Sequence, residues 1–177
     1  MVILLLFLLL FLMVLCFLLI FFQIYTKILH PGALFYPSSD STVSEMLKLA
    51  KVGPKDTMID LGSGDGRILV AAARLGAKAI GYEINPFLVR QSRHQIKKAK
   101  LDKLAKVYRQ SFWRADFAKD TVITVYLFPN LMDRLQKLLE KKVNHPIRLV
   151  ANDYPFPQLI PSKHEGQIYL YHLGNNH

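Results

Sequence analysis

The hydrophobic positions of this chain divide it into two parts of different character. Residues 1–22 are all apolar, and the first charged side chain is Lys27. From residue 38 onward, short apolar runs alternate with segments whose apolar positions recur at helical spacing. The continuous run predicts a helix in an apolar medium, whereas the alternation predicts an α/β domain.

The second part predicts a mainly parallel sheet with helices on both of its faces, because strands that alternate with helices are typical of βαβ units. Two helix starts carry their own signals. Thr42 and Glu45 have the form of a capping box, and Asn85 precedes a proline at the first helical position. Strands are predicted at about 57–61, 79–83, 106–109, 121–127, 147–152 and 167–173, and helices at about 42–52, 67–75, 86–104 and 131–142.

The apolar run is long enough to cross a bilayer. Residues 2–22 would form a helix of about 31 Å at 1.5 Å per residue. A cleaved signal peptide is the main alternative, but the run has no basic residues before it and no small-residue cleavage site after it. A soluble buried helix is the other alternative. We therefore predict a transmembrane anchor over residues 1–22, a connector over 23–37 and one domain over 38–177.

The distribution of charge predicts how the anchor is oriented in the membrane. The chain has 23 Lys and Arg against 13 Asp and Glu, a formal net charge of +10, and all of these residues follow the apolar run. The positive-inside rule then predicts a single-pass membrane protein with its domain on the cytoplasmic side. The bilayer, contacted through residues 2–22, is the expected partner, because no nucleic-acid-binding motif is found.

Histidine and cysteine offer little other chemistry. The one cysteine, Cys16, lies in the apolar run, so an intramolecular disulfide and a cysteine nucleophile in the domain are both excluded. His145, His164 and His172 lack the spacing of metal ligands, and we expect no metal site.

A glycine-rich turn, D-L-G-S-G-D-G-R at residues 60–67, lies where the first strand meets a helix. Glycines allow the backbone to turn tightly close to a ligand, and ligands of open α/β sheets bind at the carboxyl ends of strands. The turn differs from the dinucleotide fingerprint because its third glycine, Gly66, comes one residue early. Asp60 also ends the strand, and a carboxylate there suits a cationic amine better than a pyrophosphate.

A second acid, Glu83, ends the next predicted strand. A carboxylate at that position can accept hydrogen bonds from both hydroxyls of a ribose. An ordinary strand–helix turn with a solvated glutamate is the alternative. Asp60, the glycines and Glu83 together favour a ligand that carries both an amine and a nucleoside.

These motifs resemble those of class I S-adenosylmethionine-dependent methyltransferases. More narrowly, the domain resembles the small membrane-tethered lysine methyltransferases that modify the c-subunit of ATP synthase and the adenine nucleotide translocase, and their prokaryotic relatives. The matching stretches are Y-P-S-S-D at 36–40, residues 60–67, G-Y-E-I-N-P at 81–86, residues 125–129 and Y-P-F-P at 154–157. The resemblance implies a Rossmann-like class I methyltransferase sheet and S-adenosyl-L-methionine as the cofactor.

The resemblance also implies roles for single residues. Asp60 would lie near the amino group of the cofactor, Glu83 would hold the ribose, and Asn85 would lie close to the adenine. Where such enzymes often place an aspartate for the adenine amino group, this chain has Ser111, which can still hydrogen-bond. The implied cofactor-binding residues are Asp60, Gly62, Ser63, Gly64, Asp65, Gly66, Glu83, Asn85 and Ser111.

Tyr126, Phe128 and Pro129 follow the fourth predicted strand, where many class I enzymes carry an acceptor-binding loop. By this resemblance Tyr126 would orient an amine, while Phe128 and Pro129 would pack on its alkyl stem. The alternative is an ordinary strand end that packs into the core.

Basic residues form a stripe on the predicted helix 86–104, at Arg90, Arg93, Lys97 and Lys100. A solvated helix face is one explanation. Attraction to an anionic leaflet, about 1 kcal/mol per basic residue near the surface, is the other.

Three functions remain open at this stage. The first is a membrane-anchored methyltransferase acting on lysine of a membrane or membrane-associated protein. The second is a methyltransferase acting on a lipid or quinone-like small molecule. The third is a non-catalytic cofactor-binding scaffold.

Overall fold

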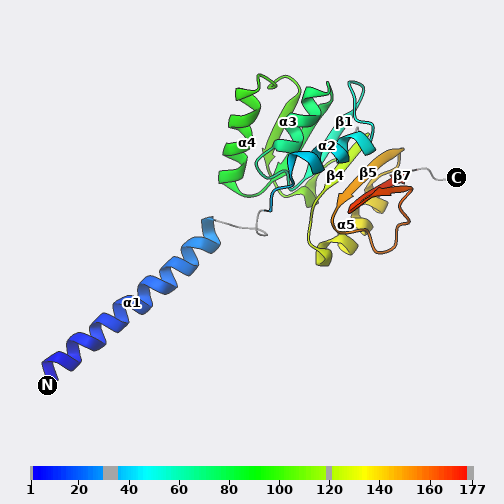
Figure 1. Ribbon diagram of the computed structural model, residues 1–177. Helices are drawn as coiled ribbons and strands as arrows, with labels where there is room; N and C mark the ends of the chain where they lie inside the picture. Colours follow the sequence, from blue (N-terminus) through cyan, green and yellow to red (C-terminus); the bar gives the residue numbers. More distant parts are fainter. Residues whose placement is uncertain (1, 30–35, 119–120, 175–177) are drawn as a thin grey trace. The chain divides into compact units, whose positions relative to one another are not determined.

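The computed structural model describes residues 2–29, 36–118 and 121–174 (Figure 1). In the first of these ranges the side chains described are those of residues 6–22. The chain divides into two units, Met1–Ala33 and Leu34–His177, and each is described by itself.

The first unit holds one helix, α1 (Val2–Leu29). The side chains of residues 6–22 are exposed throughout, and the rings of Phe17 and Phe21, one turn apart, stack with centroids 6.4 Å apart. Among the residues that the structure describes, no helix is both long and apolar enough to cross a membrane. The transmembrane anchor over 1–22 thus gains no support here and stays a prediction.

The second unit is an α/β domain with one seven-stranded sheet, in the order β3-β2-β1-β4-β5-β7-β6. The first five strands in that order pair in parallel, while β7 runs antiparallel to both β5 and β6. The mainly parallel sheet predicted from the sequence is therefore confirmed. Its strands are β1 (Thr57–Leu61), β2 (Lys78–Glu83), β3 (Ala105–Arg109), β4 (Val122–Val125), β5 (Ile147–Asn152), β6 (Lys163–Glu165) and β7 (Ile168–Leu173).

Helices cover both faces of the sheet, as the sequence predicts. One face packs against α2 (Asp40–Leu49), α3 (Arg67–Arg74) and α4 (Pro86–Lys98), and the other against α5 (Pro129–Lys142) (Figure 1). A short 3-10 turn, Phe112–Arg114, follows β3. Because both faces are covered, the central strands are continuous apolar runs, and all four residues of β4 are buried.

Several helix and strand boundaries differ from the sequence prediction, among them the start of α2, the end of α4 and the start of α5. α2 begins at Asp40 and is capped by Ser39, whose hydroxyl accepts a hydrogen bond from the Thr42 amide at 3.1 Å, so the capping box predicted at Thr42 is wrong. α4 ends at Lys98, six residues early, because Lys100 adopts a left-handed φ of 59°. The Leu101 amide then bonds the Ile96 carbonyl, as in a Schellman motif. Lysine in place of the usual glycine concealed this helix end.

The third of these differences is at α5, which begins at Pro129, two residues before the predicted start. The strand β6 was not predicted at all. Its three residues are polar and exposed, so the sequence offers none of the apolar alternation that indicates a strand.

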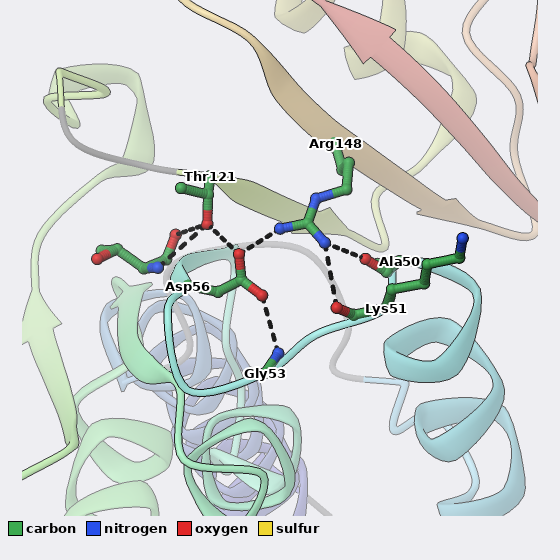
Figure 2. Close-up of polar contacts among 7 residues, drawn as sticks. Ala50, Lys51, Gly53, Asp56, Thr121 and Arg148 are labelled. Atoms are coloured by element: carbon green, nitrogen blue, oxygen red, sulfur yellow. Dashed lines mark hydrogen bonds and ion pairs between the residues drawn. The ribbon is translucent and has the colours of Figure 1, made fainter.

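A polar cluster ties the end of α2 to the amino-terminal edge of the sheet (Figure 2). The Asp56 carboxylate accepts hydrogen bonds from the Gly53 amide at 2.8 Å and the Thr121 hydroxyl at 2.7 Å, and it forms an ion pair with Arg148 of β5. Arg148 also donates to the carbonyls of Ala50 and Lys51, at the carboxyl end of α2. A single arginine therefore joins α2, the start of β1 and β5.

Substitution of Asp56 should reveal the contribution of this cluster to stability. We expect Asp56→Ala to lower the free energy of unfolding of the full chain by about 2–3 kcal/mol, because it leaves a partly buried arginine without its counter-charge. Urea unfolding measures the change. Lys163→Ala, which removes the exposed pair with Glu165, is the control and should unfold like the wild type. Equal stability of the Asp56 variant would contradict this role.

Candidate functional site

The glycine turn lies between β1 and α3, and its left-handed backbone favours glycine. Gly62, Gly64 and Gly66 have φ values of 86°, 54° and 85°. A Cβ atom on Gly66 would also lie 2.2 Å from the hydroxyl oxygen and 3.1 Å from the Cα of Ser92, on α4. The turn therefore lets α3 and α4 approach each other while it keeps its backbone close to the strand ends.

Asp60 is a carboxylate buried at the carboxyl end of β1. Its side chain is only 3% exposed, and the Thr124 hydroxyl of the neighbouring β4 donates to it at 2.9 Å. Burial, together with the negative charges of Glu83 and Asp65, raises the pKa of Asp60 to about 7, although the Thr124 hydrogen bond opposes this rise. A buried carboxylate with so little compensation would be stabilised by a cation, so the site suits a ligand with a positively charged amine.

Glu83 is also buried, but its carboxylate accepts more hydrogen bonds than that of Asp60. One of its oxygens accepts from the Gly64 amide at 3.0 Å and the other from the Asn85 amide at 2.7 Å. Asn85 in turn caps α4, accepting from the Phe87 amide at 2.9 Å. Glu83 thus joins the glycine turn to the start of α4, and each carboxylate oxygen retains room for another donor such as a ribose hydroxyl.

Asp65, whose contact with the cofactor stays a prediction, is bound to Arg67 within the turn. Its carboxylate accepts hydrogen bonds from the backbone amide and the guanidinium of Arg67, with the closest contact at 2.8 Å. Although burial alone would raise the pKa of Asp65, these bonds hold it below its usual value. Arg67 also donates to the carbonyl of Ser38 at 2.7 Å. Asp65 therefore helps to hold the segment before α2 against the glycine turn.

The two serines predicted to contact the cofactor lie in different surroundings. The Ser63 hydroxyl is buried against Gly81 of β2 and has no hydrogen-bond partner among the described residues. Ser111 is half-buried and begins the 3-10 turn without using its hydroxyl to cap it. The Gln110 amide, one residue earlier, donates to the Glu83 carbonyl at 3.1 Å, so Ser111 lies beyond the same strand edge as Glu83.

The predicted acceptor residues follow β4, the strand next to β1. Tyr126 is half-buried, Phe128 is 43% exposed, and Pro129 is the first residue of α5. Burial raises the pKa of Tyr126, and its hydrogen bond to Asp153 raises it further. All the predicted site residues therefore belong to the carboxyl edge of the sheet, with the cofactor set at or after the ends of β1, β2 and β3 and the acceptor set after β4.

Sequence reasoning missed three polar side chains at this edge. Thr124 contacts Asp60, and its presence in the otherwise aliphatic strand V-I-T-V was a usable signal. Arg67 stood inside the glycine motif, but its contact with Ser38 depends on the tertiary fold. Asp153 follows β5 and carried no local signal. In the described part of the chain, no group of three or more side chains is arranged to hold a metal ion.

The region that contains this edge of the sheet is similar to known proteins. A family model described as the ANTKMT methyltransferase domain matches residues 60–163. The mouse ATP synthase C-subunit lysine N-methyltransferase is 34% identical over 133 residues, which cover 75% of this chain and 53% of that protein. A protein-lysine N-methyltransferase of Saccharolobus islandicus is 31% identical over 156 residues, covering 82% of this chain and 97% of that protein.

A solved structure agrees with the sequence comparisons. An RNA methyltransferase from Salinibacter ruber in complex with S-adenosyl-L-homocysteine has a TM-score of 0.77 and 32% sequence identity, and the match covers 80% of this chain and 95% of that one. The domain therefore has the Rossmann-like methyltransferase fold expected from its motifs. The chain spans little more than half the length of the mouse relative.

The buried Asp60 predicts how cofactor binding depends on pH. Below pH 7 the free protein holds Asp60 mostly protonated, whereas a bound ammonium favours the carboxylate. The affinity for S-adenosylmethionine should therefore rise from pH 5 to about 7, at most about tenfold per pH unit, and then level off. Calorimetry of the wild type and of Asp60→Asn measures this. The variant should bind more weakly and without that rise.

The matched control is Asp102→Asn, which removes an exposed carboxylate outside the site. It should keep the wild-type affinity and pH profile. The assignment of Asp60 to the cofactor amine would be wrong if Asp60→Asn kept them too.

Proposed function

Because the chain belongs to the ANTKMT methyltransferase family, we propose that it methylates the side-chain amine of lysine in a membrane or membrane-associated protein. The main support for this proposal is the set of site residues that lie inside the region matched by the family model. Residues 60–163 include both buried acids, the glycine turn and the loop after β4. The mouse and Saccharolobus islandicus relatives are named lysine N-methyltransferases.

The cofactor half of the site would work by charge and by fit. S-adenosylmethionine supplies a methyl group carried on a sulfonium, which a neutral amine can take up by in-line displacement. Asp60 would bind the cofactor's amino group and Glu83 its ribose hydroxyls, while Asn85 and Ser111 would lie near the adenine. The closely packed turn at Gly62, Gly64 and Gly66 would bring the backbone against the methionyl part.

The acceptor half must change the protonation state of its substrate. A lysine amine has a reference pKa of about 10.4, so it reaches the site as an ammonium and has to lose a proton before it can react. Tyr126 would orient the amine, and Phe128 and Pro129 would pack on the alkyl stem. Removal of the lysine amine from water favours its neutral form and so lowers its pKa.

We also propose that residues 1–22 form a single-pass membrane anchor with the domain on the cytoplasmic side. The support is the charge-free apolar run, whose side chains at residues 6–22 are exposed, and a large exposed apolar surface marks an interaction site. The basic stripe on α4 adds to this. Arg90, Arg93, Lys97 and Lys100 are all exposed and can face an anionic leaflet.

Two other methyl acceptors have to be tested alongside lysine. A lipid or quinone-like molecule would share the bilayer with the proposed anchor. RNA is suggested by the similarity to the Salinibacter ruber protein, which is described as an RNA methyltransferase. A scaffold that binds the cofactor without transferring the methyl group is the remaining alternative.

Labelled cofactor should distinguish these acceptors. We expect the full chain, incubated with methyl-labelled S-adenosylmethionine and membranes from cells that lack it, to place label in protein and on lysine by mass spectrometry. Glu83→Ala should reduce labelling at least tenfold, and Asp102→Asn should leave it unchanged. Label in the solvent-extractable fraction or in RNA would replace lysine as the acceptor, and cofactor binding without any label would favour the scaffold.

Fractionation tests the anchor. The full chain should sediment with membranes and resist extraction by high salt, whereas a chain lacking residues 1–29 should be released. Protease added outside intact cells should leave the domain whole. A full chain that high salt releases would contradict the anchor, and a domain cut from outside would reverse the proposed orientation.

A further inference from the structure

Polar groups end four neighbouring strands at the carboxyl edge of the sheet. In the order β2, β1, β4 and β5, they are Glu83, Asp60, Tyr126 and Asp153, the last two directly following their strands. Glu83 and Asp60 are assigned above to the cofactor. The Tyr126–Asp153 pair on the other half of the edge has no partner in that scheme, and it lies where an acceptor would approach.

Tyr126 follows β4, the strand that pairs with β1 at Asp60. The hydroxyl of Thr124 in β4 donates to Asp60 at 2.9 Å, and Tyr126 comes two residues later, just past the end of the strand. The Tyr126–Asp153 pair therefore lies beyond the strand that contacts the carboxylate proposed to hold the cofactor amine.

Asp153 is held in an unusual backbone conformation next to Tyr126. Its φ is 64°, a left-handed value that few residues other than glycine adopt. The Asp153 amide donates to the Gln167 carbonyl and the Tyr154 amide to the Asn152 carbonyl, both at 2.8 Å, and these bonds fix the bend. The Asp153 carboxylate lies near the Tyr126 phenol, whose pKa is raised by burial and by this carboxylate.

Two further tyrosines lie beside this pair. Tyr36 meets the ring of Tyr126 edge-on with centroids 6.4 Å apart, and Tyr154 is the residue next to Asp153. The segment that carries Tyr36 is held at Ser38, which contacts Arg67 at 2.7 Å and Asn152 at 3.4 Å. Aromatic faces beside a carboxylate attract organic cations.

A cavity next to Asp153 is lined by further acids. Asp153 lines a cavity of about 440 Å³ together with Glu45 of α2 and Glu165 of β6. Lys48 lines the same cavity, and Glu165 is paired with Lys163 at 2.6 Å. Two carboxylates, those of Glu45 and Asp153, thus outnumber the lysine that lines this wall.

We propose that Asp153, Tyr126, Tyr36 and Tyr154 form the subsite that receives the acceptor lysine as its ammonium. Asp153 supplies the counter-charge, the three rings supply the cation-binding walls, and the Tyr126 phenol holds the Asp153 carboxylate in place. This subsite deepens the proposed function and depends on it for the identity of the acceptor. Its recognition of an alkylammonium, however, can be measured without any methyl transfer.

The probe is n-butylammonium, which carries the end of a lysine side chain, with 1-butanol as the uncharged comparison. Saturation-transfer NMR on the full chain in detergent micelles should show contact for butylammonium and far less for butanol. Asp153→Asn should weaken butylammonium binding at least fivefold. Tyr36→Phe should keep it and Tyr36→Ala should weaken it, because the ring face rather than the hydroxyl makes the contact.

Two controls separate this subsite from the cofactor site and from misfolding. Asp102→Asn should bind butylammonium like the wild type. Asp153→Asn should bind S-adenosylmethionine with unchanged affinity by calorimetry, which also shows that it is folded. In the labelling assay, Asp153→Asn should need about tenfold more membrane protein to reach the half-maximal rate.

The outcomes are distinct. Equal butylammonium binding by the wild type and Asp153→Asn, or equal binding of butylammonium and butanol, would overturn the subsite even if lysine is methylated. If the binding differences hold but no lysine is labelled, the subsite stands as an alkylammonium site and the proposed function fails. A loss of cofactor affinity in Asp153→Asn would overturn the assignment of Asp153 to the acceptor.

Discussion

The burial of two carboxylates at the ends of neighbouring parallel strands is the constraint on which the rest of the domain depends. The buried Glu83 carboxylate is stabilised by hydrogen bonds from two backbone amides, those of Gly64 and Asn85. These bonds also fix the path of the glycine turn. Asp60 has the Thr124 hydroxyl, and its pKa rises to about 7. A domain that keeps so poorly compensated an acid loses stability as the pH rises from about 4 to about 7, and a cationic ligand would restore it.

Two arginines hold the helix that borders this edge. Arg148 binds the carbonyls of Ala50 and Lys51 at the carboxyl end of α2 and pairs with Asp56. Arg67 binds the carbonyl of Ser38, next to the cap of the same helix, and pairs with Asp65. Because each arginine also contacts an acid beside β1, α2 and the segment before it are fixed to the strand that carries Asp60. The position of Tyr36 follows from this attachment.

The sequence predicts the parts of this arrangement that depend on local patterns. The bounds of β1 and β5 are correct to the residue, since buried parallel strands are continuous apolar runs. The glycine turn and both acids follow from the same pattern. The end of α4 is not predictable in this way, because Lys100 adopts a conformation that glycine would have signalled. The pairing of Tyr126 with Asp153 joins two strand ends, and only the strand order brings them together.

Charge is distributed so that a basic domain can still receive a cationic side chain. The net charge of +10 would repel a lysine at long range, and much of it is carried on helices such as α4, which packs over β2 and β3. From β2 to β5 there are three strand spacings, about 14 Å, which exceeds the Debye length of about 8 Å at physiological salt. Local carboxylates therefore govern the field at Asp153. The same separation leaves the basic stripe free to act on an anionic surface without weakening the acceptor subsite.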